Sequence, residues 1–182
     1  ETDGACACIV TTPERAKDLA QTPALIRAVA QGAGPDQEWM ASFYRPDITE
    51  LPELGIVARQ LYEVSGLRPD DIAAAILYDA FTAIVLFQLE AYGFCKRGEA
   101  KDFVKNGNIE VGGRLPVNTH GGLLGEAYIH GMNNILEGVR QIRGTAVNQV
   151  AGAETVMVAG GRSGLILHPA GWTEKSFCGW QT

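Results

Sequence analysis

Apolar positions along the chain follow two kinds of pattern. Residues 52–66 carry apolar side chains at helical spacing, and a second helix is expected over residues 81–91. Short apolar runs at residues 5–10, 25–30 and 72–79 predict strands, and the last run does not alternate, as expected for a strand covered on both faces. Strands that alternate with helices in this way indicate a layered α/β architecture.

Local signals mark where several elements start and end. Thr12 can cap a short helix that begins at Pro13 and ends near residue 21. Gly66 fits a helix C-terminal cap. Predicted strands at residues 154–159 and 165–168 flank a glycine-rich turn, which indicates a hairpin. The segments expected to be surface loops are residues 35–49 and 96–114.

The stretch around which the rest of the chain is organised is residues 115–133. It begins as a polar, glycine-rich loop, and from Leu123 to Gly144 the apolar residues follow helical spacing. The pattern predicts a loop that feeds one long, mostly apolar helix. Backbone N–H groups at such a helix start favour negative charge, so we expect the chemistry of the protein here.

Polar side chains in this stretch are candidates for chemistry. Tyr128 and His130 fall in the first two turns of the predicted helix, where a buried polar group needs a partner or a function. His130 can also have a purely structural role, because it can pair with Glu126 at i, i+4 spacing. The preceding loop supplies three polar residues and two glycines that allow close approach of a ligand, namely Asn118, Thr119, His120, Gly121 and Gly122.

A further candidate lies at the end of the predicted strand 72–79. Tyr78 and Asp79 stand where a buried strand gives way to a helix, and ligands of α/β folds bind at that edge. Tyr78 can also be a packed residue at a strand end, and Asp79 can be the N-cap of the next helix. Spacing alone therefore predicts an α/β domain with a polar site near residues 78, 118–120 and 128.

Composition narrows the class of protein. A formal net charge of −6 argues against nucleic acid as a partner, and none of the three histidines stands at a zinc-ligand spacing from a cysteine. Cys6 and Cys8 fall in the first predicted strand and are expected to be small core residues. No secretory signal and no apolar run of membrane-spanning length is present, so the expectation is a cytoplasmic protein with no membrane contact. Because the chain enters a strand at once without an initiator methionine, we expect a piece of a longer polypeptide or a processed subunit.

Several motifs together resemble the thiolases. Thr2-Asp3-Gly4-Ala5 before an apolar run resembles the strand that re-enters the core after the thiolase loop domain. Other motifs resemble, in order, the C-terminal half of the sterol-carrier-protein type of thiolase: Asp79-Ala80-Phe81, Gly93-Phe94-Cys95, Leu115-Pro116-Val117-Asn118, Gly121-Gly122 and Gly160-Gly161.

This resemblance implies a layered αβαβα thiolase fold, of which the chain supplies mainly the C-terminal half. Residues 1–34 are then the last strand–helix–strand elements returning from the N-terminal and loop region, and residues 35–182 are the C-terminal domain. The domain ends in an aromatic tail with Trp172, Phe177 and Trp180, which departs from the usual thiolase ending and is expected to pack on a partner or on the other half.

Three departures from the thiolase pattern bear on function. Tyr78 stands where thiolases keep an asparagine or histidine, and Val158 where they keep an acid/base cysteine. Tyr128, six residues beyond the second glycine, stands where they keep a catalytic histidine. The nucleophilic cysteine of thiolases belongs to the half that is not in this sequence, and the three replacements argue against thiolase chemistry.

The segment around Tyr128, Gly125 to Asn133, resembles the thiolase-like aldolases of bacterial steroid side-chain degradation. That resemblance implies retro-aldol cleavage of a β-hydroxyacyl-CoA to a ketone and a shorter acyl-CoA such as propionyl-CoA. Tyr128 and Tyr78 become the acid/base pair, with the two roles not separated, and Asn118 and His120 orient the thioester or stabilise its enolate. The residues expected to contact the substrate are Asp79, Gly121, Gly122 and His130.

The resemblance also implies partners. It predicts a homodimer through the thiolase fold and a small OB-fold partner protein, often with a zinc ribbon, and no cofactor or metal in this chain other than the coenzyme A of the substrate. Three alternatives stay open: an acetyl-CoA acyltransferase with its cysteine in the other half, a non-catalytic thiolase-like scaffold subunit, and a bare acyl-CoA-binding module.

Overall fold

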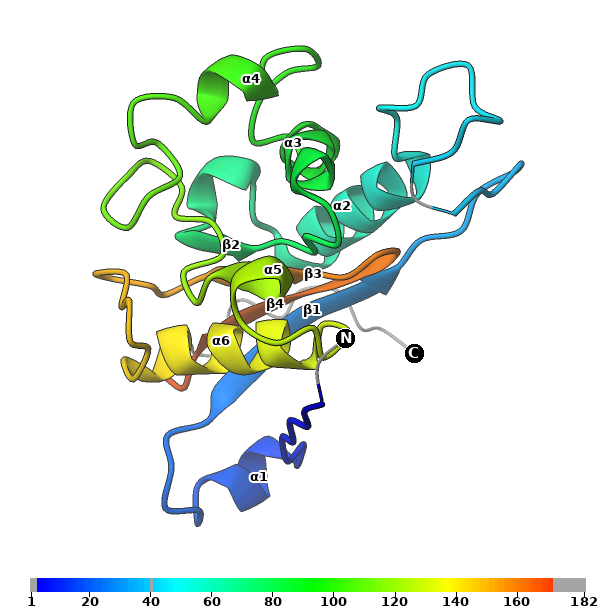
Figure 1. Ribbon diagram of the computed structural model, residues 1–182. Helices are drawn as coiled ribbons and strands as arrows, with labels where there is room; N and C mark the ends of the chain where they lie inside the picture. Colours follow the sequence, from blue (N-terminus) through cyan, green and yellow to red (C-terminus); the bar gives the residue numbers. More distant parts are fainter. Residues whose placement is uncertain (1–2, 40, 172–182) are drawn as a thin grey trace.

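The computed structural model describes residues 3–39 and 41–171. Within these residues, a β-sheet lies between two layers of helices, with α2, α3 and α4 above the sheet and α6 below it in the view of Figure 1. The layered α/β architecture predicted from the sequence is therefore confirmed. The predicted aromatic tail, with Trp172, Phe177 and Trp180, lies outside the described residues.

The middle layer is a mixed four-stranded sheet with the order β1-β4-β3-β2. β1 pairs antiparallel with β4, β4 pairs antiparallel with β3, and β3 pairs parallel with β2. The predicted hairpin is confirmed, with Val156 opposite Leu167. The bounds of the strands are Ala24–Gln31 for β1, Ala74–Ile76 for β2, Val156–Ala159 for β3 and Ser163–Pro169 for β4.

The helices cover both faces of this sheet. α2 contacts β1 and β4 from one side, and α6 contacts all four strands from the other. A single 3-10 turn, Pro69–Asp71, precedes β2. The short α4 lies inside residues 96–114, which were expected to be loop only. The bounds of the helices are Pro13–Ala16 for α1, Pro52–Ser65 for α2, Thr82–Ala91 for α3, Ala100–Phe103 for α4, Gly122–Gly125 for α5 and Met132–Arg143 for α6.

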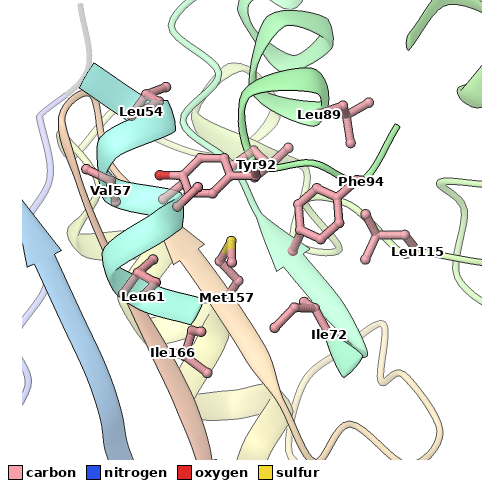
Figure 2. Close-up of a cluster of buried hydrophobic side chains, with 14 of the residues drawn as sticks. Leu54, Val57, Leu61, Ile72, Leu89, Tyr92, Phe94, Leu115, Met157 and Ile166 are labelled. Carbon is pink, nitrogen blue, oxygen red and sulfur yellow. The ribbon is translucent and has the colours of Figure 1, made fainter. Parts of the chain in front are cut away.

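The strands divide their side chains between two cores. On β3, Met157 and Ala159 belong to the core under α2, whereas Val156 and Val158 belong to the core over α6. Figure 2 shows the first core, where side chains of α2 pack against Met157, Ile166 and Tyr92. Because each face of the sheet is covered, every position of β3 is buried, which explains why its sequence does not alternate. Each fully buried large side chain contributes roughly 1.5–3 kcal/mol.

The predicted helix caps at Thr12 and Gly66 are confirmed, but some elements are shorter than predicted. The Thr12 hydroxyl accepts a hydrogen bond from the Arg15 N–H at 3.4 Å, and Gly66 ends α2 with a φ of 68°. α1 nevertheless ends at Ala16, well before residue 21. The strand predicted over residues 72–79 is confined to β2, so that Tyr78 lies just beyond it.

The first predicted strand is wrong in the described structure. Residues 5–10 form no strand, and Ile9 and Val10 are 90% and 75% exposed. Cys8 is exposed and Cys6 is partly exposed, so neither is a core residue. The apolar pattern is that of a strand, but a strand also needs a neighbour for its backbone hydrogen bonds, and no strand pairs with this segment within the described residues.

The single long helix predicted from Leu123 to Gly144 is also wrong. α5 ends at Gly125, residues 126–131 are not helical, and α6 starts only at Met132. Gly131 has a φ of 91° and interrupts the helical pattern, because that backbone conformation cannot continue a right-handed helix. Tyr128 therefore lies in a loop between two helices. α6 also buries polar residues, namely Asn133, Asn134, Glu137 and Gln141.

No helix among the described residues is both long enough and apolar enough to cross a membrane.

The close approach of α6 to the sheet gives a test of this packing. In Gly138→Ala the added methyl would lie 2.7 Å from Val158 Cγ2 and 3.1 Å from Leu167 Cδ1. We expect the free energy of unfolding to fall by about 1–3 kcal/mol, because the overpacking outweighs the better helix propensity of alanine. Gly55→Ala in α2 is the matched control, since a Cβ there meets nothing within 4 Å and should stabilise by up to about 1 kcal/mol. Denaturant unfolding measures the free energy of unfolding of both variants. An equal increase in Gly138→Ala and Gly55→Ala would contradict the tight packing of α6.

Candidate active site

The two tyrosines singled out in the sequence meet in space. Tyr78 follows β2, and Tyr128 lies in the loop between α5 and α6. Their phenol oxygens are 2.5 Å apart, and their rings stand edge to face with centroids 6.2 Å apart. The fold therefore joins residues separated by fifty positions into one hydrogen-bonded pair.

A buried glutamine of α3 holds the backbone of Tyr78. The Tyr78 N–H donates to Gln88 Oε1 at 3.2 Å, and Gln88 Nε2 donates to the Tyr78 carbonyl at 2.5 Å. Gln88 is 0% exposed, so both bonds are shielded from water. The sequence analysis did not single out this residue, although one amide in a mostly apolar helix is a signal that could have found it.

Asn118 fixes the residue before Tyr78. Its Oδ1 accepts a hydrogen bond from the Leu77 N–H at 2.7 Å, and its own N–H donates to the Ala75 carbonyl at 3.1 Å. Asn118 also has a φ of 49°, in the left-handed region that asparagine tolerates better than most residues. Its side-chain oxygen is thus engaged in holding the loop against the end of β2.

His120 is buried behind the tyrosines. Its side chain is 4% exposed, and its Nε2 lies 3.2 Å from Asn134 Oδ1 and 3.9 Å from Glu126 Oε2. Because both of these atoms are acceptors, the ring carries its proton on Nε2. Nδ1 is buried without a partner among the described residues. The predicted helical pairing of Glu126 with His130 is absent, because residues 126–131 are not helical.

Asp79 ties the Tyr78 segment to α5. Its Oδ1 accepts a hydrogen bond from the Leu123 N–H at 2.8 Å, and the residue is 5% exposed. Asp79 is therefore an N-terminal cap, but of α5 rather than of α3, the helix that follows it in sequence. Gly122 has a φ of 70°, and a Cβ there would collide with the Asp79 carboxylate. Contact of Asp79, Gly121 and Gly122 with a substrate stays a prediction.

A buried polar cluster supports the loop from below. The Thr119 hydroxyl donates to Glu137 Oε1 at 2.5 Å, and Gln141 Nε2 donates to the same oxygen at 2.9 Å. Asn148 Nδ2 donates to the Thr119 carbonyl at 2.7 Å. Glu137 and Gln141 are 2% and 1% exposed. The cluster fixes residues 118–120 on the polar side of α6.

A cavity of about 260 Å³ opens beside Tyr78. Tyr78 and His130 line one part of it, and Trp39, Arg162 and Ser163 line another. His130 has a φ of 48°, and its ring packs edge to face on Tyr128 with centroids 4.9 Å apart. The predicted residues are thus brought together in part: Tyr78 and His130 line the cavity, and Tyr128 contacts both of them. Asn118, His120 and Asp79 do not line the cavity and hold the surrounding segments through hydrogen bonds. Trp39 and Arg162 were not predicted as site residues.

Burial sets the protonation of Tyr78. Loss of water around the phenol raises the pKa of Tyr78 well above the ordinary value, and the hydrogen bond to Tyr128 raises it further. Tyr78 therefore remains a protonated phenol at neutral pH and can act as a donor.

Metal ligation was not expected for this chain. Among residues 3–39 and 41–171, no group of three or more His, Cys, Asp and Glu side chains is arranged to hold a metal ion. The absence of a cofactor other than coenzyme A stays a prediction.

The Asp79 cap gives a test of how the site is held. Asp79→Ala is expected to lower the free energy of unfolding by about 1.5–3 kcal/mol, because the Leu123 N–H loses a charged acceptor in a buried place. Asp79→Asn keeps an oxygen at that position and should lose less. Urea unfolding of both variants measures the difference, and an alanine variant as stable as the wild type would show that the cap contributes nothing.

Comparisons with known proteins agree with this architecture. The chain is 62% identical over 171 residues to the 17-hydroxy-3-oxo-4-pregnene-20-carboxyl-CoA lyase of Mycobacterium tuberculosis, covering 92% of this chain and 44% of the relative. It is 60% identical, with the same coverage, to the steroid side-chain-cleaving aldolase of Thermomonospora curvata. The chain thus spans less than half the length of these relatives.

A solved structure and a family model agree with these two relatives. The structure of an Ltp2-ChsH2(DUF35) aldolase superposes with a TM-score of 0.83 at 59% identity, covering 88% of this chain and 43% of that chain. The model of the thiolase C-terminal domain-like family matches residues 34–169. The resemblance to the C-terminal half of the thiolases is confirmed, and the chain belongs to the thiolase C-terminal domain-like family.

Proposed function

We propose that this protein is a thiolase-like aldolase, a carbon–carbon lyase that cleaves a β-hydroxyacyl-CoA. The observation that carries the proposal is the hydrogen-bonded pair of Tyr78 and Tyr128, 2.5 Å apart, with Tyr78 lining a cavity. The names of two relatives that are 60% and 62% identical, a steroid side-chain-cleaving aldolase and a steroid carboxyl-CoA lyase, support a steroid side-chain CoA ester as the substrate.

Retro-aldol cleavage needs a base and an acid but no covalent nucleophile. The base takes the proton of the β-hydroxyl, the oxygen electrons form the carbonyl of the ketone, and the bond between the α and β carbons breaks. Its electron pair becomes the enolate of the shorter acyl-CoA, and the acid then protonates the α carbon. A propionyl-CoA enolate would give propionyl-CoA in this last step.

The geometry favours one division of these roles. Because burial raises the pKa of Tyr78 and so disfavours its phenolate, we assign this residue as the acid that protonates the enolate carbon. Tyr128, its hydrogen-bond partner, is the residue through which the β-hydroxyl proton leaves. The two phenols form one hydrogen-bonded unit.

Asn118 and His120 set the position of the tyrosine pair. Asn118 Oδ1 is engaged by the Leu77 N–H, and His120 Nε2 faces Asn134. These bonds hold both residues in place, so we assign both to orienting the Tyr78 and Tyr128 segments. Direct contact with the substrate is assigned to His130, which lines the cavity.

Thiolase chemistry is less well supported. Val158 occupies the position of the acid/base cysteine and is 4% exposed in the core over α6, and Tyr128 occupies the position of the catalytic histidine. An acetyl-CoA acyltransferase would lack both groups in this half.

The assembly is part of the same proposal. We infer a homodimer through the thiolase fold and a complex with a small OB-fold partner, acting in the cytoplasm with no cofactor but the coenzyme A of the substrate. The name of the aldolase that superposes on this chain, Ltp2-ChsH2(DUF35), joins two components, which supports a heteromeric complex.

Removing one phenol oxygen tests the reaction. In the complete enzyme with its partner, Tyr128→Phe is expected to lower kcat for cleavage of a steroid β-hydroxyacyl-CoA by about 10²–10⁴, because the proton path loses one member. Release of ketone and propionyl-CoA is the measurement.

Tyr62→Phe is the matched control for this test, since Tyr62 also spends its hydroxyl on one hydrogen bond, to the Tyr92 carbonyl at 2.8 Å in the core. CoA-dependent acyl exchange without cleavage would return the protein to the thiolases. A wild type with neither cleavage nor acyl-exchange activity would favour the scaffold alternative.

The raised pKa of Tyr78 predicts the pH profile. Because the protonated phenol is the active form and its pKa is raised, kcat/KM should hold up to the ordinary tyrosine pKa of about 10 and fall only above it. Rates measured from about pH 6 to about pH 11 test this, and Tyr78→Phe should lose most of the activity across that range. A fall in kcat/KM centred below the ordinary tyrosine pKa would contradict the acid role of Tyr78.

A further inference from the structure

Arg162 stands on the wall of the cavity that Tyr78 also lines. It lies in the turn between β3 and β4, and its guanidinium carbon is 5.4 Å from the centre of the Trp39 ring. Trp39 belongs to the loop before α2 and is 69% exposed. Of the described residues that line this cavity, Arg162 is the only lysine or arginine.

The turn that carries Arg162 is anchored at both of its sides. The Gly160 N–H donates to the Ser163 carbonyl at 2.7 Å, and the Gly32 N–H at the end of β1 donates to the Arg162 carbonyl at 2.9 Å. A Cβ at Gly160 would lie 2.6 Å from Ser163 Oγ, so the turn admits only glycine there without rearrangement. The backbone of Arg162 is thus held in a fixed place relative to the sheet.

The charge of Arg162 has no carboxylate against it among the described residues. Three other arginines, Arg45, Arg97 and Arg114, each form an ion pair with an aspartate or glutamate. Arg162 instead stacks on an aromatic face, which stabilises a cation while leaving its in-plane N–H groups able to bind an anion. A cation that lines the same cavity as the Tyr78 phenol is suited to a ligand with negative charge.

The reaction proposed above creates such a charge within reach of Tyr78. The thioester enolate carries its negative charge largely on oxygen, and donors aimed at that oxygen are a main source of rate. Of the described residues that line the cavity with Tyr78, Arg162 is the one that brings a fixed positive charge to that oxygen.

We propose that Arg162, stacked on Trp39, binds the thioester oxygen of the acyl-CoA and stabilises the enolate that forms when the carbon–carbon bond breaks. This inference rests on the proposed function, because the enolate is the intermediate of retro-aldol cleavage. It adds to that function a substrate-contacting cation and a wall of the acyl-CoA pocket, built from the β3–β4 turn and the loop before α2.

The test is a comparison of kcat with KM in the complete enzyme and its partner. Arg162→Gln is expected to lower kcat by about 10²–10³, the usual loss of one oxyanion donor, while KM for the acyl-CoA and the dissociation constant of free coenzyme A stay near the wild-type values. Arg162→Lys should recover part of the rate, because it keeps the charge but not the planar fork. Trp39→Ala should lower kcat through loss of the stacking partner.

Arg114→Gln is the matched control. Arg114 also lies over an aromatic ring, that of Phe103 at 5.3 Å, but it pairs with Asp70 and does not line the cavity. Its kcat and KM should equal those of the wild type.

Each of the following outcomes overturns the proposal that Arg162 stabilises the enolate. Weakened coenzyme A binding with unchanged kcat in Arg162→Gln would place a phosphate, not the enolate, against this arginine. Unchanged kcat in Arg162→Gln and Trp39→Ala, with an active wild type, would remove Arg162 from the reaction and leave the aldolase proposal standing. A wild type without cleavage activity would instead overturn the aldolase proposal, and this inference with it. If Arg162→Gln fails to fold by circular dichroism, Arg162→Lys and Trp39→Ala decide, and wild-type kcat in both overturns the proposal.

Discussion

The site depends on how the protein satisfies the backbone just past the end of an edge strand. β2 is the last strand of the sheet, and beyond Ile76 no strand continues beside it among the described residues. Two amide side chains take the place of that neighbour. Asn118 accepts from the Leu77 N–H, and Gln88 binds both the N–H and the carbonyl of Tyr78. Backbone groups buried without such partners would each cost about 1–3 kcal/mol, so these amides are what keeps Tyr78 in a defined position.

The same principle governs the other half of the site. α6 packs its apolar side on the sheet, which its glycine at position 138 allows at close range, and turns a buried polar side toward the loop that precedes it. Glu137 and Gln141 hold Thr119, while Asn134 holds His120. A polar network that is satisfied in this way is rigid, because any displacement leaves a buried group without its partner. The loop of residues 118–120 is thus supported from α6 and the Tyr78 segment from α3, and Asp79 joins the Tyr78 segment to α5.

These constraints give a consistent chemical picture. The pair of phenols requires neither a thiolate nor a covalent intermediate, and burial keeps one of them protonated as an acid. Tyrosines that replace the polar residues of a thiolase site can therefore serve proton transfer while the surrounding fold is retained. The β3–β4 turn places a cation, Arg162, on the lining of the same cavity as Tyr78, which fits the negative charge of the enolate in the proposed reaction.

The sequence by itself predicted the class of the fold and singled out the two tyrosines that the fold brings together. Apolar runs and helix signals placed β1, α2, α3 and the β3–β4 hairpin, because burial on both faces and local capping leave direct traces in the order of residues. Tyr78 and Tyr128 were found by their departure from a family pattern. Tertiary structure decided the rest. It broke the expected helix at Gly131, left residues 5–10 without a strand partner, and turned Asp79 toward α5. The contacts of Gln88, Asn134 and Arg162 also came only from the structure, because they join segments far apart in the chain, and periodicity carries no information about which segments meet.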